Sequence, residues 1–242
     1  PFETFAAKPG LTVTEMVHGA LRGDIRAIYV MGENPMLSDP NLNHVAEALD
    51  AVEFLVVQDI FPNETAQRAD VVLPAAGFAE KLGTFTNTER RVQLIRPAIA
   101  PPGVSRPDWA IALDLAQRLG APWQYDGPEA IFAEMAGLTP QYAGITYDRL
   151  ERGGIQWPCP TVDHPGTPVL HIGKFTRGKG LFCPLEYRPP AELPDDQFPF
   201  LLSTGRILFH WHGGTMSRRS PGLDAAAPEA EAELPPDDAT RL

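Results

Sequence analysis

Short apolar runs alternate with polar, turn-rich segments through the first third of the chain. The segments between the runs contain Asn-Pro and Ser-Asp-Pro turns and a stretch with helical spacing at 42–50. This order of strand, loop, helix and strand predicts an α/β fold built on a doubly wound parallel sheet. The predicted strands are three short runs rich in strand-forming side chains: Ala27–Met31, Phe54–Gln58 and Val71–Leu73.

Helical periodicity continues into the middle of the chain and then fades. Ser105 to Asp108 form a capping box, and the apolar residues after it recur at helical spacing as far as Gly120. Proline and glycine then interrupt the pattern from Gly153 onward, which predicts a connector wrapped over a surface. The remaining predicted elements are helices at 11–21, 128–136 and 147–152, strands at 92–96 and 199–204, and a hairpin formed by 169–175 and 181–187.

Polar residues follow each of the three predicted strands. A Gly-Glu-Asn-Pro turn containing Asn34 follows the first strand, and Gln58 and Asp59 end the second. The segment 77–93 follows the third. In doubly wound sheets, ligands bind outside the carboxyl ends of the strands. The sequence therefore predicts that these three loops converge on one ligand-binding crevice.

The segment 77–93 is expected to be a loop that grips an anion, unlike a packed strand or helix. It places Lys81, Arg90 and Arg91 among glycine, threonine and asparagine residues. A lysine acts as a point charge and an arginine as a two-pronged donor, and both suit phosphate oxygens. The alternative is a solvated surface cluster, which is what most charged runs are.

Two carboxylates allow either a structural or a binding interpretation. Asp59 lies just beyond the second strand, where it could be a turn or helix-entry residue, and Asp108 lies in the capping box. Either could instead accept two parallel hydrogen bonds from the N1–H and N2–H edge of guanine, or from a ribose diol. Both interpretations stay open at this point.

The segment 204–219 combines glycines with a His-x-His pair, His210 and His212. A strand would put both imidazoles on one face without a third ligand nearby, which disfavours a metal site. Gly205, Gly213 and the neighbouring threonines better suit a backbone cradle for a planar ligand that carries phosphate.

Composition narrows the class of protein. The net charge of −11 argues against general nucleic-acid binding, and the last twenty residues contribute six acids against one arginine. No apolar run reaches the roughly 18 residues that a membrane-spanning helix needs. Two cysteines are too few for a metal cluster or a disulfide framework and mildly favour a reducing compartment. The absence of an initiator methionine predicts that the sequence is an internal piece of a longer protein.

Seven segments together resemble a known family: YVMGENPMLSDPN, FLVVQDIFPNETAQRADVVLP, FAEKLGTFTNTERRVQ, RPDWAIALDLAQRLG, GGIQWPCP, DHPGTPVLH and STGRILFHWHGGTMSRR. They are similar to the molybdopterin oxidoreductases of the dimethyl-sulfoxide-reductase type, and most closely to formate dehydrogenase α subunits. The resemblance implies a Rossmann-like cofactor-binding domain over 1–152 and a connector over 153–197. It further implies the start of a β-barrel domain over 198–242.

The resemblance also implies roles for single residues. Asn34 would contact the cofactor, Gln58 and Asp59 its nucleoside, Lys81 a phosphate or the pterin, and Asp108 the guanine. One departure is that Gly213 stands where the family usually has threonine, so a hydroxyl donor is absent. The implied strand-to-loop cradle consists of Thr204, Gly205, Arg206, His210, His212 and Gly213.

By the same resemblance, the cofactor is bis(molybdopterin guanine dinucleotide) with molybdenum or tungsten. The metal ligand, the other catalytic residues and a [4Fe-4S] cluster belong to an N-terminal part outside this sequence, so no catalytic residue is assigned here. The longer protein would be cytoplasmic and would oxidise formate to CO2, with iron–sulfur or flavin partner subunits and NAD as the electron acceptor. The alternatives are a nitrate-reductase-type relative and a non-catalytic homologue in a respiratory complex.

Overall fold

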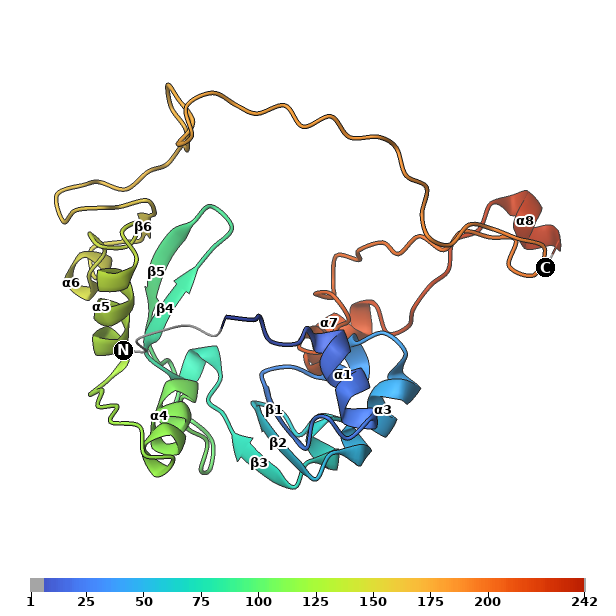
Figure 1. Ribbon diagram of the computed structural model, residues 1–242, viewed down its shortest axis with the longest axis horizontal. Coiled ribbons are helices and arrows are strands. Elements are labelled where there is room, and N and C mark those ends of the chain that lie inside the picture. The colour runs from blue at the N-terminus through green and yellow to red at the C-terminus, as the bar shows by residue number, and fades with distance from the viewer. Residues whose placement is uncertain (1–6, 242) are drawn as a thin grey trace.

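The predicted parallel sheet is present in the computed structural model, which describes residues 7–241 (Figure 1). Its strands lie in sequence order, with Val30 opposite Val57 and Gln58 opposite Leu73. All three strand predictions are confirmed to within one residue. The strands are β1 (Ala27–Met31), β2 (Phe54–Asp59) and β3 (Val71–Pro74), with helices α1 (Val13–Leu21), α2 (Pro35–Ser38), α3 (Leu42–Ala51) and the short η1 (Ala66–Arg68) around them.

Helices α1 and α3 pack on one face of this sheet because the strand residues that point toward them are apolar. Val30, Leu55 and Val57 are buried there against Val45 and Leu49 of α3. Residues one position along a strand point to the opposite face. That other face carries Tyr29 and Met31, which stay largely exposed. The two faces therefore differ in chemistry, and only one belongs to this core.

The strand order agrees with the predicted parallel α/β sheet but does not confirm that the sheet is doubly wound. A doubly wound sheet reverses its strand order at a switch point. Among the described residues the order runs β1, β2, β3 without reversal, and Arg106 continues it beside Ala75 through a short parallel bridge. The fold is α/β with a parallel three-stranded sheet.

The segment 77–93 is mostly a β-hairpin, and the prediction of an irregular loop was wrong there. After the short η2 (Phe78–Glu80), strands β4 (Gly83–Thr86) and β5 (Arg91–Ile95) pair antiparallel. Arg90 adopts a left-handed backbone with φ 67° at the hairpin turn. The predicted strand at 92–96 is thus confirmed within one residue at each end. A third strand, β6 (Ile155–Gln156), pairs with β5 from more than 60 residues away, which local sequence could not show.

A second core forms between this antiparallel sheet and the helices that follow. Val92 and Ile155 from the strands pack with Phe132, Tyr147 and Leu150 from the helices. The helix predictions are confirmed, with boundaries shifted by a few residues. The predicted capping box at Ser105–Asp108 was wrong: the helix follows Pro107 without a side-chain cap, and the Ser105 hydroxyl donates to the carbonyl of Pro102. The helices are α4 (Asp108–Arg118), α5 (Pro128–Leu138) and α6 (Tyr147–Leu150).

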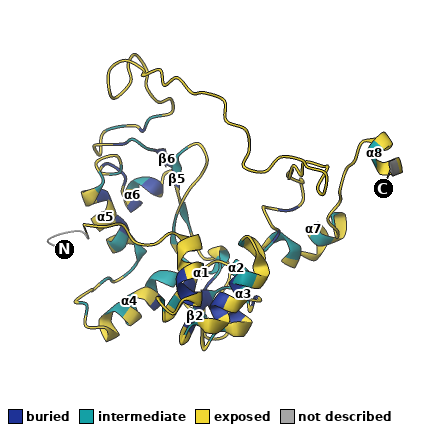
Figure 2. Cartoon of the chain, turned by 45° about the vertical axis from the view of Figure 1, so that its right-hand side comes forward, coloured by how far each residue is buried: buried dark blue, intermediate teal, exposed yellow. Residues whose placement is uncertain are grey.

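The connector and the C-terminal region differ from the predictions. The structure describes no strand between 157 and 241, so the hairpin at 169–187, the strand at 199–204 and the start of a barrel are not observed. Residues 178–209 are exposed rather than wrapped over a surface (Figure 2). A strand needs a neighbour to satisfy its backbone groups, and the described chain offers none here. The helical pieces of this region are η3 (Ser217–Arg219), α7 (Pro221–Ala226) and α8 (Pro236–Arg241).

Among the described helices, none combines the length and the apolar character that crossing a membrane requires.

Candidate functional site

Four polar side chains form a continuous hydrogen-bonded row near the carboxyl edge of the parallel sheet. The Tyr29 hydroxyl donates to Oε1 of Gln58. Nε2 of Gln58 donates to Oδ1 of Asp108 over 2.8 Å, and Nζ of Lys81 donates to Oδ2 over 2.5 Å. Three of the four residues, Gln58, Lys81 and Asp108, were predicted from the sequence as site residues. The structure brings them together, and we refer to Tyr29, Gln58, Lys81 and Asp108 as the polar row.

The strand register explains why Tyr29 and Gln58 meet. Tyr29 lies opposite Val56 in the parallel pair of β1 and β2. Gln58 is two residues beyond Val56, so its side chain points to the same face of the sheet. This face is the one opposite helices α1 and α3. Tyr29 was not predicted as a site residue. The alternation of side chains between the two faces of a strand, combined with a parallel register, would have placed it beside Gln58.

A backbone bridge carries Asp108 to this edge. The amide of Arg106 donates to the carbonyl of Pro74 over 3.1 Å, and the amide of Ala76 donates to the carbonyl of Arg106 over 2.8 Å. Residues 105–107 therefore run alongside the end of β3, and α4 begins with Asp108 directly afterwards. Lys81 approaches from the other side, after the short η2 turn that Glu80 caps through the amide of Gly77.

The row keeps its carboxylate ionised. Burial raises the pKa of Asp108, but hydrogen bonds from Lys81 and Gln58 and the charge of Lys81 outweigh it, and the pKa lies below its ordinary value. Burial, together with the negative charge of Asp108, raises the pKa of Tyr29. The phenol thus stays protonated at neutral pH and remains a donor. The result is a carboxylate that only accepts hydrogen bonds, held by Lys81 and Gln58, with Tyr29 donating in turn to Gln58.

Asp59 and Asn34 are engaged in local structure. Asp59 accepts from the amide of Phe61 over 2.9 Å and from Nδ2 of Asn63 over 3.0 Å, as expected for a turn carboxylate. Asn34 is 2% exposed; its Nδ2 donates to Glu64 and its Oδ1 accepts from the Thr65 hydroxyl, each over 2.7 Å. These contacts hold the loops after β1 and β2 against each other.

The side chains of Arg90 and Arg91 bind protein groups around the second core. The Arg90 guanidinium donates to the carbonyls of Trp157, Thr167 and Pro168 and lies 5.6 Å from the centre of the Trp157 ring. Arg91 binds Glu89 and the carbonyl of Gly154. Their donors are therefore directed at the protein itself, and the interpretation of this pair as a phosphate clamp is not supported.

The predicted cradle at 204–213 has no described contact with Gln58, Lys81 or Asp108. Thr204, Gly205, Arg206, His212 and Gly213 are exposed, whereas His210 is buried and pairs with Ser217 and the carbonyl of Ala227. The stretch just after it contacts the loop that follows β2, since the Arg219 guanidinium lies 4.5 Å from the centre of the Phe61 ring.

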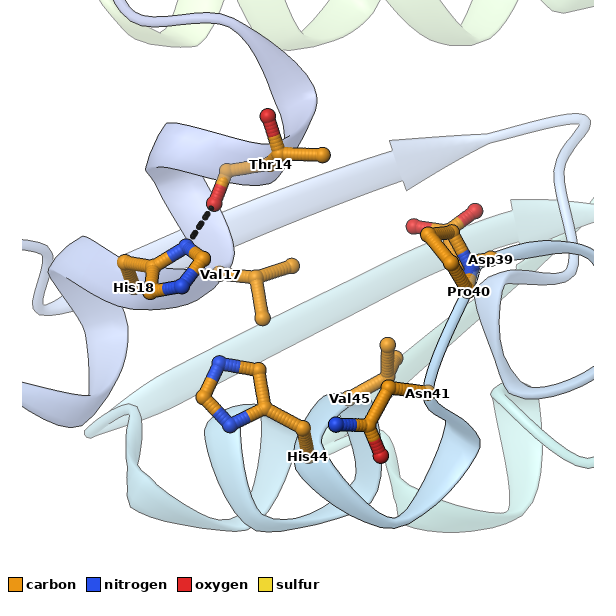
Figure 3. A pocket seen from close by; sticks show the side chains of 8 residues that line it. All are labelled: Thr14, Val17, His18, Asp39, Pro40, Asn41, His44 and Val45. Atoms are coloured by element: carbon orange, nitrogen blue, oxygen red, sulfur yellow. Dashed lines mark hydrogen bonds between the residues drawn. The ribbon is translucent and has the colours of Figure 1, made fainter. Parts of the chain in front are cut away.

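A hollow of about 230 Å³ lies between helices α1 and α3 (Figure 3). Nδ1 of His18 donates to the carbonyl of Thr14 over 2.6 Å, and the rings of His18 and His44 are 4.9 Å apart. Nε2 of His44 is buried without a hydrogen-bond partner. Across residues 7–241, no group of three or more His, Cys, Asp or Glu side chains is placed to hold a metal ion.

Comparison with known proteins places the part of the chain that forms the polar row in a family. Residues 3–118 match the family model for molybdopterin oxidoreductases. The chain belongs to the molybdopterin oxidoreductase family. All four residues of the polar row lie inside the matched region.

The relatives of this family member include formate dehydrogenase subunits. The F420-dependent formate dehydrogenase subunit alpha of Methanocaldococcus jannaschii is 54% identical over 237 residues, which is 96% of this chain and 35% of that protein. An F420-dependent formate dehydrogenase 2 subunit alpha of Methanococcus maripaludis is 48% identical with the same coverage. A Bacillus subtilis protein described as an oxidoreductase, YjgC, is 42% identical over 95% of this chain and 24% of its own length. The chain thus spans between 24% and 35% of the length of these curated relatives.

Proposed function

We propose that this chain forms part of a formate dehydrogenase α subunit and holds a guanine nucleotide arm of its molybdopterin cofactor. In this proposal Asp108 accepts hydrogen bonds from N1–H and N2–H of the guanine, and Lys81 supports Asp108 and neutralises a nearby phosphate. When bound, the cofactor supplies the redox chemistry, and this chain supplies binding, orientation and charge.

The observation that carries the proposal is the ionised, acceptor-only Asp108 at the carboxyl edge of a parallel sheet. Its carboxylate offers about four lone-pair positions, of which Gln58 and Lys81 each use one. The side chains of Asp108 and Lys81 are 38% and 22% exposed, so a ligand can reach them. A donor edge with two parallel N–H groups matches the remaining acceptor capacity. The residues present therefore fit a guanine base.

The other predicted contacts have weaker support. Asn34 and Asp59 already bind neighbouring protein groups, so we propose that they shape the loops around the nucleotide, and that Asp59 offers only its remaining lone pairs. For Thr204, Gly205, Arg206, His212 and Gly213, the proposal as cofactor contacts rests on the family resemblance alone. His210 is occupied by its own segment.

For the longer protein, we propose oxidation of formate to CO2, with the electrons leaving through iron–sulfur clusters toward an acceptor on a partner subunit. The names of the archaeal relatives favour F420 over NAD as that acceptor. The same names favour formate over the nitrate-reductase alternative.

The test compares two aspartates on the same helix. Cofactor-free protein is titrated with GMP by calorimetry, as wild type, as Asp108→Asn and as the control Asp114→Asn. Asp114 binds Arg106 and Arg118 at the surface of α4 and lies outside the polar row. Hydrogen bonds to a charged group are worth about 1.5–3 kcal/mol, so Asp108→Asn should weaken GMP binding roughly 10- to 100-fold. Asp114→Asn should bind as the wild type does.

Unchanged GMP affinity in Asp108→Asn would contradict the assignment of guanine to this residue. Cofactor content offers a second measure: GMP released by acid hydrolysis of protein purified from a cofactor-producing host should fall in Asp108→Asn and not in Asp114→Asn. Chemical denaturation of both variants establishes that each is folded.

A further inference from the structure

We propose that Tyr29 is a positioning residue that sets the preference of this site for guanine, acting through Gln58 on Asp108. The inference rests on the proposed function, because it concerns the nucleotide that Asp108 accepts. Tyr29 itself need not touch the base. Its contribution is to fix the direction in which the Asp108 carboxylate presents its free lone pairs.

The hydrogen bonds of the polar row have only one possible direction. Lys81 can only donate, and the ionised Asp108 can only accept. The Gln58 amide must then turn its Nε2 toward Asp108, which leaves Oε1 facing Tyr29. Because Oε1 is an acceptor, the Tyr29 hydroxyl has to be the donor.

The burial of Gln58 makes this last donor important. Gln58 is 0% exposed, so water cannot replace the phenol. A buried acceptor without a partner is destabilising because its lost hydration is not replaced. Without the hydroxyl of Tyr29, Gln58 gains by rotating toward another donor, and it then releases Oδ1 of Asp108. One of the two bonds that fix the plane of the carboxylate is lost, while the bond from Lys81 remains.

A loosely held carboxylate penalises some ligands more than others. Guanine presents two parallel donors, N1–H and N2–H, and needs both carboxylate oxygens in its plane. Hypoxanthine lacks the 2-amino group and presents N1–H alone. The ratio of the affinities for GMP and IMP therefore reports the orientation of Asp108, whereas a general loss of stability would lower both affinities together.

The experiment measures GMP and IMP dissociation constants of cofactor-free protein by calorimetry. The variants are Tyr29→Phe and the control Tyr125→Phe, which removes a phenol-to-carboxylate hydrogen bond at Glu134, outside the polar row. The wild type should prefer GMP by roughly tenfold or more, the value of one hydrogen bond to a charged group. Tyr29→Phe should reduce this preference to within about threefold, and Tyr125→Phe should retain it.

A second variant covers the case in which Tyr29→Phe does not fold. Gln58→Met removes the amide and keeps the length of the side chain, and it should lose the preference as Tyr29→Phe does. Where both fold, the double variant should show no further loss, because the two residues act in series.

The outcomes separate this inference from the proposed function. A wild type that prefers GMP, together with a Tyr29→Phe variant that keeps the same ratio, would overturn the role of Tyr29. So would an equal loss of both affinities in Tyr29→Phe, and so would Gln58→Met with an unchanged ratio. A wild type that binds neither nucleotide would instead overturn the proposed function.

Discussion

Single residues determine the charge state of the candidate site. Among them, Lys81 contributes most to lowering the pKa of Asp108. Desolvation on its own would raise the pKa of Asp108, and the hydrogen bond and charge of Lys81, with Gln58, bring it below the ordinary value of 3.8. A carboxylate whose pKa is lowered by folding stabilises the folded state above about pH 4. That contribution is lost as the pH falls through the lowered pKa. At neutral pH the Asp108 carboxylate is therefore fully ionised and paired with the Lys81 ammonium.

Replacing Lys81 should move the pH dependence of nucleotide binding. In Lys81→Met the burial of Asp108 remains and the hydrogen bond and charge of Lys81 are gone, so the pKa of Asp108 should rise from its lowered value. GMP affinity should then begin to fall at a higher pH than in the wild type as the solution is acidified. Calorimetric titrations between about pH 4 and 7 would measure this. Lys81→Arg keeps the charge and should stay close to the wild-type profile; identical profiles for Lys81→Met and wild type would rule out this role of Lys81.

At the scale of elements, the second core depends on segments that approach one another closely. Arg90 joins the β4–β5 hairpin to the connector through three carbonyls. Gly144 brings the turn after α5 against the segment that follows β6, with its amide 2.7 Å from the carbonyl of Cys159. A Cβ at this position would lie 2.0 Å from the carbonyl oxygen of Thr161. Neither contact is between neighbours in the sequence.

Two glycine substitutions should have opposite effects on stability. Gly144→Ala forces the turn and the facing backbone apart, and we expect a loss of about 2–4 kcal/mol in the free energy of unfolding. Gly137→Ala lies in α5 with nothing within 4 Å of the added Cβ. Alanine is favoured over glycine in helices, so Gly137→Ala should gain about 0.5–1 kcal/mol. Urea denaturation measures both, and a Gly144→Ala protein as stable as the wild type would show that this close approach is not required.

At the scale of the whole molecule, the buried apolar side chains gather in two small cores, and a long exposed segment follows them. Large apolar side chains along this segment are almost fully accessible, for example Phe182 at 97% and Leu208 at 92%. In Figure 1 the segment arches away from both cores before it reaches α7. Few buried contacts and an exposed backbone are the properties of a region that opens at low cost.

Limited proteolysis should therefore begin in this segment. Trypsin is expected to cut after Lys174, Arg177 or Lys179, all exposed, before it cuts within the two cores. Mass spectrometry of the first products would identify the sites, with pre-denatured protein as the control in which all basic residues are cut at similar rates. Early cleavage at Arg26, Arg68 or Arg91 would contradict the described arrangement.

The sequence alone determined those strands and helices that depend on patterns among neighbouring residues. Apolar runs and turn residues were enough to predict β1, β2 and β3, and helical spacing was enough for α4 and α5. Because parallel strands end at one edge, the sequence also predicted that the loops carrying Gln58 and Lys81 would converge. Asp108 was assigned to the same site only by the family resemblance.

The tertiary structure decided what depends on partners distant in sequence. Tyr29 belongs to the site because the strand register places its side chain on the same face of the sheet as Gln58. It lies 79 residues before Asp108 in the sequence. Arg90 turned toward carbonyls near 157–168 rather than toward a ligand. The apolar run at 199–204 formed no strand, because the backbone of a strand requires a neighbour and the described chain supplies none there. Local patterns fix which conformation a segment favours, and only the fold fixes which groups its side chains and backbone meet.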